Sequence, residues 1–308
     1  MNKENALFKM LVLIVITIYT TGVYAQGYEI KVSLNTKHYD SLHLKAYDGK
    51  KDFVDIQAMP FAKTVVFKNK KSLEPGIYLL QGDTIGITEI LISDHKSQQI
   101  SIIEKDSVIT FVNSPENTAN QQYMKDMREF DRRMYQLDQE FKEMQQSNLP
   151  QYMMQPFVDT LMARAIRIGD EKTAFQHAKA EQYKQYLLGS IIRATMEMPN
   201  PPREIYGSQQ KMQMFIANHL YDNYPWHDER MINTPLAVNK HKQFANLMYY
   251  LDYELAEPYM RTALKEAKAN DKVYFSFFDM MEEILGATKS PYRVEGLYII
   301  MLKDAIAY

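Results

Sequence analysis

The residues Val108–Met127 read VITFVNSPENTANQQYMKDM, and the spacing of the apolar side chains changes within this stretch. Before Asn113, apolar residues follow the period of two that a β-strand imposes. After Pro115, apolar residues return every three or four positions, which is the spacing of a helix. The intervening residues Asn113–Asn117 carry turn chemistry. The stretch therefore predicts that a β-sheet domain ends and a helical domain begins here.

Upstream of this stretch, the period of two extends from Tyr28 to Val112 and is interrupted by turn residues such as Asp48-Gly49 and Pro75-Gly76. Short strands at regular spacing, without helix-length segments between them, favour an antiparallel sandwich or open barrel over a βαβ fold. We therefore predict an α+β protein whose antiparallel β-sandwich-like domain occupies residues 26–115. The expected strands lie within 28–34, 42–46, 64–67, 77–80, 85–92, 100–103 and 108–112.

Downstream of it, we predict an all-helical domain over residues 116–308. An apolar stripe with heptad spacing over 123–144 predicts a long helix that packs on its own domain. Alternatively, the stripe pairs two protomers in a homo-oligomer. The proline-rich residues 198–202 predict a stiff extended segment between helical layers. Further helices are expected over 154–168, 171–196, 208–223, 235–251, 257–269, 272–285 and 291–307.

The N-terminus has the features of a secretion signal. An apolar run over Met10–Thr20 follows Lys3 and Lys9, and Val23-Tyr24-Ala25 is a small-x-small cleavage pattern. The apolar run is shorter than the roughly 20 residues of a membrane-spanning helix, which disfavours an uncleaved anchor. We therefore expect residues 1–25 to be a signal peptide, and the mature chain to be periplasmic or otherwise extracytoplasmic, without a stable membrane anchor.

Composition excludes several classes of function. The chain has 308 residues, 46% of them hydrophobic and 24% charged, as expected for a soluble globular protein. Its net charge of −2 provides no basic field for nucleic acid. Zero cysteines exclude disulfides, thiolate nucleophiles and Cys-ligated zinc within this chain. No nucleotide-binding or hydrolase motif occurs in the sequence, so we assign no catalytic residue and no cofactor.

The stretch His219–Glu229 is the best candidate for metal or catalytic chemistry, because it places imidazoles and carboxylates around one predicted helix end. It lacks any established metal-binding spacing. We therefore favour a structural interpretation in which Asp222 and Asn223 end the helix, Trp226 anchors the turn in the core, and Asp228 begins the next turn.

Methionine and tyrosine counts suggest two further alternatives. The 20 methionines offer thioethers for Cu(I), and the 22 tyrosines offer rings for a sugar- or peptide-binding groove. Most of these residues fall at helical spacing, where core packing explains them. We assign no metal site.

Two sets of residues resemble one known family. Leu73–Leu79 (LEPGIYL) and Ser114–Asn117 are similar to the N-terminal region of Bacteroidetes-type secreted thioredoxin-like proteins of the TlpA/ResA kind. Asn218–Asn223, Asp228–Pro235 and Lys240 resemble the uncharacterised helical domain that precedes the thioredoxin domain in that family. The family-signature and interaction positions are Asp222, Asn223, Trp226, Asp228, Arg230, Thr234 and Pro235.

The resemblance implies a β domain and a helical domain that lie beside a redox module in relatives. This chain has no cysteine, so the family's thiol–disulfide exchange cannot be assigned to any of its residues. We therefore expect a non-catalytic extracytoplasmic accessory or binding protein, with an envelope protein such as a thioredoxin-like protein as its partner. The alternative is the front part of a thiol–disulfide oxidoreductase whose thioredoxin domain is lost or encoded separately.

Overall fold

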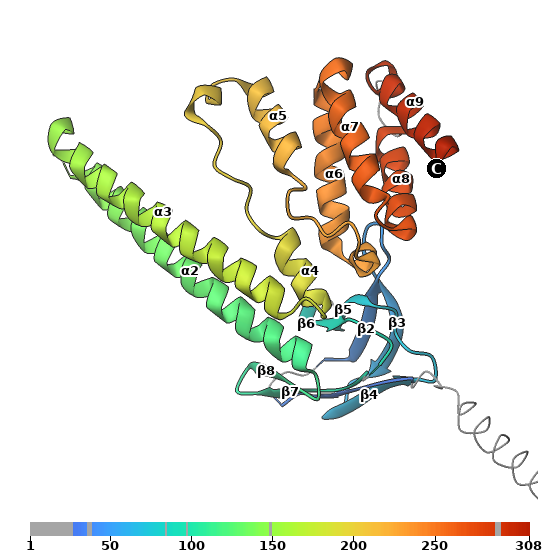
Figure 1. The fold of residues 1–308 in the computed structure, drawn as a ribbon. Helices are drawn as coiled ribbons and strands as arrows, with labels where there is room; N and C mark the ends of the chain where they lie inside the picture. The colour runs from blue at the N-terminus through green and yellow to red at the C-terminus, as the bar shows by residue number, and fades with distance from the viewer. Residues whose placement is uncertain (1–26, 36–38, 84, 97, 148–149, 287–290) are drawn as a thin grey trace, which may run out of the picture.

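A computed structural model describes residues 27–35, 39–83, 85–96, 98–147, 150–286 and 291–308. The signal peptide expected over residues 1–25 lies outside the described residues. Among these residues, eight strands come first and the helices follow them (Figure 1). The α+β arrangement predicted from the sequence is confirmed.

The strands form two four-stranded sheets. One sheet has the order β4-β1-β7-β8, and the other has the order β3-β2-β5-β6. Their bounds are β1 Tyr28–Ser33, β2 Ser41–Tyr47, β3 Phe53–Pro60, β4 Thr64–Asn69, β5 Gly76–Gly82, β6 Ile85–Ile92, β7 Gln99–Lys105 and β8 Val108–Val112.

The strand pairing differs from an all-antiparallel sandwich at one position. β1 and β7 pair in parallel, with Ile30 opposite Ile100 and Val32 opposite Ile102. Strands β2 to β6 lie between β1 and β7 in the sequence. No short hairpin therefore joins β1 to β7 and forces them to run in opposite directions. All four side chains are buried, as the alternation predicted.

No alternation of apolar residues indicated β3, and the position of this strand in the sheet explains why. β3 is an edge strand that pairs only with β2, and Val54 and Ile56 are 47% and 41% exposed. A strand that buries so little shows no apolar alternation in its sequence.

The helices are α2 Pro115–Gln146, α3 Gln151–Gln182, α4 Leu187–Ala194, α5 Gln209–His219, α6 Pro235–Tyr250, α7 Tyr253–Ala267, α8 Asp271–Gly286 and α9 Pro291–Ala307, with two short 3₁₀ helices, η1 Arg203–Ile205 and η2 Glu229–Asn233. α2 and α3 form a long hairpin that projects from the body, which we call the arm (Figure 1). Residues 195–202 cross from α4 towards α5 without regular structure, as the prolines predicted, and we call this segment the strap.

Several predicted helix boundaries were wrong. α5 ends at His219, so Asp222 and Asn223 lie three and four residues beyond the helix that they were expected to end. α3 continues through Gly169, where the sequence indicated a break, because a single glycine costs a helix only about 1 kcal/mol. The helix breaks instead between α3 and α4, and the first turn of α4 packs closely against the end of α3. A Cβ on Gly189 would lie 2.6 Å from the Tyr183 carbonyl oxygen, so this close approach requires glycine.

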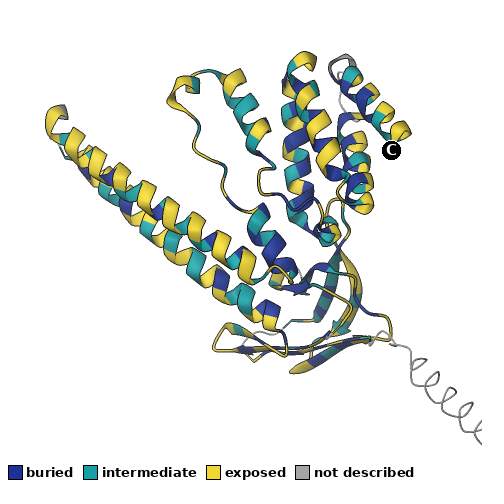
Figure 2. Ribbon diagram, viewed as in Figure 1, coloured by how far each residue is buried: buried dark blue, intermediate teal, exposed yellow. Residues whose placement is uncertain are grey.

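The helical core continues into the β domain. It is centred on α6, α7 and α8, and it includes Tyr47, Ile77 and Leu91 from the β3-β2-β5-β6 sheet. Figure 2 shows buried residues concentrated in this body, whereas much of the arm is exposed. Among the described residues, no helix is both long and apolar enough to cross a membrane.

Candidate functional site

Asp228 and Arg230 form a buried ion pair where the helical body meets the β domain. Arg230 donates to Asp228 through Nε (2.8 Å) and Nη2 (2.7 Å), and Ser190 donates its hydroxyl proton to the same carboxylate. The Asp228 side chain is 6% exposed and that of Arg230 is 19% exposed. Burial opposes ionisation of Asp228, but the Arg230 and Ser190 hydrogen bonds outweigh it and lower its pKa.

The same guanidinium joins three segments of the chain. Its remaining N–H groups donate to the carbonyl oxygens of Ser93 (3.5 Å), Gln185 (3.3 Å) and Tyr186 (3.4 Å). Ser93 follows β6, whereas Gln185 and Tyr186 precede α4. Arg230 therefore fixes the helical body to the β domain, and we call this contact region the joint.

Glu116 adds a second buried carboxylate to the joint. Its Oε2 accepts from the Ser93 hydroxyl (2.7 Å), and its Oε1 accepts from the backbone N–H of Leu188 (3.1 Å). Ser93 Oγ in turn accepts from the N–H of Leu187. Two side chains distant in sequence thus satisfy the free amides at the start of α4. Burial raises the pKa of Glu116, and these hydrogen bonds and Arg230 partly oppose the shift.

Asn117 pairs with the β6 backbone at an edge of the sheet. Its Oδ1 accepts from the Leu91 N–H (2.8 Å), and its Nδ2 donates to the Leu91 carbonyl (2.9 Å). Asn233 makes a further contact at the start of β5, the strand paired with β6, where it donates to the Pro75 carbonyl (2.8 Å). A Cβ on Gly76 would lie only 2.5 Å from the Asn233 Cβ, so this approach also requires glycine.

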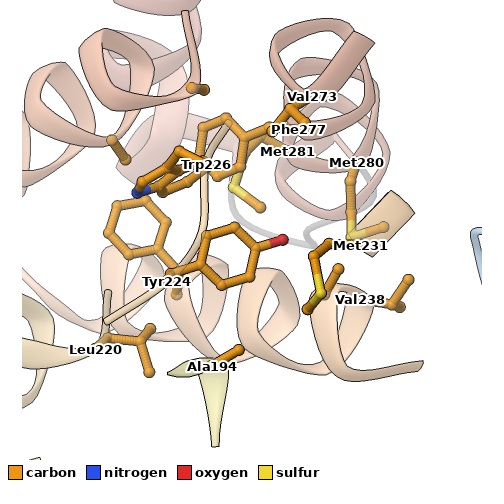
Figure 3. Close-up of a cluster of buried hydrophobic side chains, with 14 of the residues drawn as sticks. Ala194, Leu220, Tyr224, Trp226, Met231, Val238, Val273, Phe277, Met280 and Met281 are labelled. Carbon is orange, nitrogen blue, oxygen red and sulfur yellow. The ribbon is translucent and has the colours of Figure 1, made fainter. Parts of the chain in front are cut away.

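Trp226 packs inside an aromatic cluster, as the sequence analysis predicted. It is 6% exposed and meets Phe277 edge-on at 5.5 Å (Figure 3). It also stacks on His241, with ring centroids 5.8 Å apart. His241 Nδ1 lies 2.8 Å from the Tyr221 hydroxyl. Burial, assisted by neighbouring Lys240, lowers the pKa of His241 to about 3, so the imidazole is neutral at physiological pH.

The histidines and carboxylates of residues 219–229 do not converge on one point. His219 Nδ1 pairs with Asp222 at 2.6 Å beside the end of α5, whereas Asn223 and His227 are exposed. Asp228 is held by Arg230 as described above. Across the described ranges, no group of three or more His, Cys, Asp and Glu side chains is placed to hold a metal ion.

Thr234 and Pro235 start α6 as predicted. The Thr234 hydroxyl accepts from the Ala237 N–H (3.3 Å), and Pro235 occupies the first helical turn. Thr234 is completely buried. Most of the family-signature positions thus have structural roles in η2, α6, the joint or the core: Asp228, Arg230, Thr234, Pro235 and Trp226. The other two, Asp222 and Asn223, lie at the surface.

The arm buries the heptad stripe predicted over 123–144 only in part: Leu137 and Met144 are buried, whereas Met134 and Phe141 stay exposed. Leu137 packs against Leu161 and Ile168 of α3, and the two helices are also joined by Arg133–Glu171 (2.7 Å) and by Arg164–Glu140. The buried part of the stripe therefore packs within its own chain. Pairing of two protomers through the arm stays a prediction.

Apolar side chains remain exposed on the side of the arm opposite these ion pairs. Met134 and Phe141 follow Arg133 and Glu140 by one residue, which turns them about 100° around α2 and away from the ion-paired side. The same periodicity places Met162 and Ile166 on the matching side of α3. The four side chains, which we call the arm patch, are Met134, Phe141, Met162 and Ile166, exposed by 40%, 36%, 46% and 59%.

Comparison with known proteins identifies one region. Residues 170–307 match the family described as Domain of unknown function (DUF5106), so the chain contains a DUF5106 domain that begins within α3 and ends with α9. The chain matches no curated protein and no solved structure. The DUF5106 family is uncharacterised, and the match shows no association with thioredoxin-like proteins. That resemblance stays a prediction.

The sequence did not indicate that the side chains of four residues form the joint and its surroundings. These residues are Ser93, Glu116, Asn117 and Ser190. Glu116 and Asn117 lie in the first turn of α2, where an acidic or amide side chain is ordinarily a solvated helix start. Their partners are 23 to 72 residues distant in the chain. The sequence did indicate a domain boundary at Ser114–Asn117. This boundary was the one feature that pointed to Glu116 and Asn117.

Proposed function

We propose that this chain is a non-catalytic, extracytoplasmic accessory protein that binds another protein through the arm patch. The observation that carries the proposal is the arm itself, a two-helix hairpin that leaves four large apolar side chains exposed on one side. Several exposed apolar side chains gathered on one side of a projecting element are typical of an interaction site.

Charge beside the arm patch indicates the chemistry of the partner. Asp159 and Asp170 are seven residues before and four residues after Ile166, so helical spacing places them along the same side of α3. Within the described part of the chain, neither carboxylate has a cation within ion-pair distance. We propose that the partner presents an apolar surface bordered by lysine or arginine.

The joint supports the same proposal. Arg230 and Glu116 connect α2 and the strands to the helical body through buried hydrogen bonds. The base of the arm is therefore fixed, and a partner that binds the arm is held at a defined position relative to the body. The expected secretion signal and the resemblance to thioredoxin-like proteins favour an envelope protein, such as a thioredoxin-like protein, as that partner.

Site-specific photocrosslinking in the native host tests this proposal. A photoreactive residue at Ile166 lies in the arm patch, and one at Gln136 is also exposed but lies on the ion-paired side at a similar height along the arm. We expect Ile166 to give a discrete crosslinked product with one partner, which mass spectrometry identifies, and Gln136 to give none.

Two outcomes would contradict the proposal. A product containing two copies of this chain would replace the partner protein with a homo-oligomer formed by two arms. Equal labelling from Ile166 and Gln136, or labelling from neither position, would show that the arm patch binds nothing specifically. Identification of the mature N-terminus in the same sample tests secretion, which requires that the chain begin at Gln26.

A further inference from the structure

A large groove lies beneath the strap. It has a volume of about 680 Å³, within the range of about 300–1,000 Å³ that small-molecule sites occupy. The strap forms one wall, and α5 and α6 form the others. Its apolar lining consists mainly of Met196, Met198, Met212, Phe215, Ile216 and Leu236.

Lys240 supplies a positive charge to this apolar groove. The side chain is half-buried, and its Nζ donates to the Leu220 carbonyl (2.9 Å) just beyond α5. An ammonium group has three N–H donors, so this single bond leaves two donors without an acceptor among the residues that the structure describes. Burial lowers the pKa of Lys240, while Asp222 partly opposes the shift.

The carboxylates near the groove do not neutralise this charge. Asp222 pairs with His219 and lies beyond 4.0 Å from Lys240 Nζ. Glu197 also lines the groove, but its carboxylate is largely exposed and pairs with Lys172 of α3. The other polar lining side chains near Lys240 on α6 are the uncharged amides of Asn239 and Gln243. A half-buried cation with spare donors is therefore left beside an apolar surface.

We propose that this groove binds a small-molecule carboxylate with an unbranched apolar chain. The carboxylate accepts from Lys240 Nζ, and the chain lies against the methionines of the strap and the apolar side chains of α5. A charge-assisted hydrogen bond to a partly desolvated ammonium is about twice as strong as a neutral one, so the anionic head determines affinity. This site is independent of the arm patch.

Calorimetric titration of the purified protein with decanoate and, separately, with decanol tests the assignment. We expect saturable binding of decanoate at one site, and binding of decanol about tenfold weaker because it lacks the charge. Lys240→Met retains the apolar stem and should reduce decanoate affinity about tenfold while leaving decanol affinity unchanged. Lys242→Met removes a nearby lysine of α6 that does not line the groove, and should change neither affinity.

A second measurement needs only the unmodified protein. The pKa of Lys240, followed by NMR of its ε-carbon, should rise when decanoate saturates the site, because the bound carboxylate stabilises the ammonium. An unchanged pKa at saturation would overturn the proposal, as would absent decanoate binding or equal decanoate affinities in the wild type and Lys240→Met. A peptide with apolar C-terminal residues that displaced decanoate at tenfold lower concentration would assign the groove to a protein partner instead.

Discussion

Arg230 shows at the scale of one residue how the two parts of the molecule are held together. One guanidinium pairs with Asp228 and also reaches carbonyls from the end of β6 and the start of α4. The planar fork of arginine suits this task, because its several donors point in fixed directions. The same geometry makes the loss of Arg230 costly, since Asp228 would stay buried without its cation.

Arg230→Met should lower the free energy of unfolding by about 3–5 kcal/mol, because removing one partner of a buried pair leaves an uncompensated charge. Urea denaturation followed by the fluorescence of Trp226, the single tryptophan, measures this change. Arg261→Met is the matched control, because Arg261 pairs with Glu257 at the surface and should cost about 0–1 kcal/mol. Equal losses for the two variants would show that Arg230 does not support the joint.

The raised pKa of Glu116 predicts a pH dependence of stability. A carboxyl whose pKa is higher in the folded state favours folding most below its unfolded pKa, near 4.5, and that contribution is lost as the pH rises through the folded pKa. The stability of the wild type relative to Glu116→Gln should therefore be greater at about pH 4 than at about pH 7.5. Urea titrations of both proteins at the two pH values test this, and a constant or reversed difference would contradict it.

At the scale of elements, the sequence predicted the strands and helices whose buried side chains recur at regular spacing. It did not predict β3, whose side chains are mostly exposed. Strands β1 and β2 follow the alternation closely, whereas β3 lies at an exposed edge and carries no such pattern. The break between α3 and α4 depends on contact of Gly189 with Tyr183, which adjacent residues do not encode. For the same reason the joint was only partly predictable. Asp228 and Thr234 are local helix starts, but the partners of Glu116 come from distant segments.

Replacing either of two glycines by alanine should change the free energy of unfolding, in opposite directions for the two positions. Gly76→Ala should destabilise the protein by about 1–3 kcal/mol, because its Cβ would overlap Asn233. Gly169→Ala should stabilise it by about 0.5–1 kcal/mol, because that position is within α3 and a Cβ there meets open space. Thermal unfolding of both variants measures the signs, and destabilisation by Gly169→Ala would indicate that this side of the arm is covered in the native assembly.

At the scale of the whole molecule, the β domain and the helical body share buried surface as well as hydrogen bonds. Tyr47, Ile77 and Leu91 belong to the same buried cluster as the residues of α6 and α8. A shared core of this kind couples the unfolding of the elements that contribute to it. The outer arm differs, because its buried cluster is small and is formed by Leu137, Leu161 and Ile168.

Unfolding should therefore be cooperative across the joint. In urea, hydrogen exchange at the amides of β1 and β7 should report the same midpoint as the fluorescence of Trp226 in the helical body, whereas amides near Leu137 should exchange through local opening at lower free energy. Separate midpoints for the β sheet and Trp226 would show that the joint does not couple the two parts.

The central claim is that the arm patch binds a partner protein, and affinity measurement with the purified partner identified by crosslinking tests it most directly. Isothermal titration should compare the wild type with Ile166→Lys and Gln136→Lys, both at exposed helical positions where lysine is tolerated. We predict that Ile166→Lys weakens binding at least about tenfold, because it places a charge in the apolar contact, while Gln136→Lys binds like the wild type. Equal affinities for all three proteins would contradict the assignment of the arm patch as the binding surface.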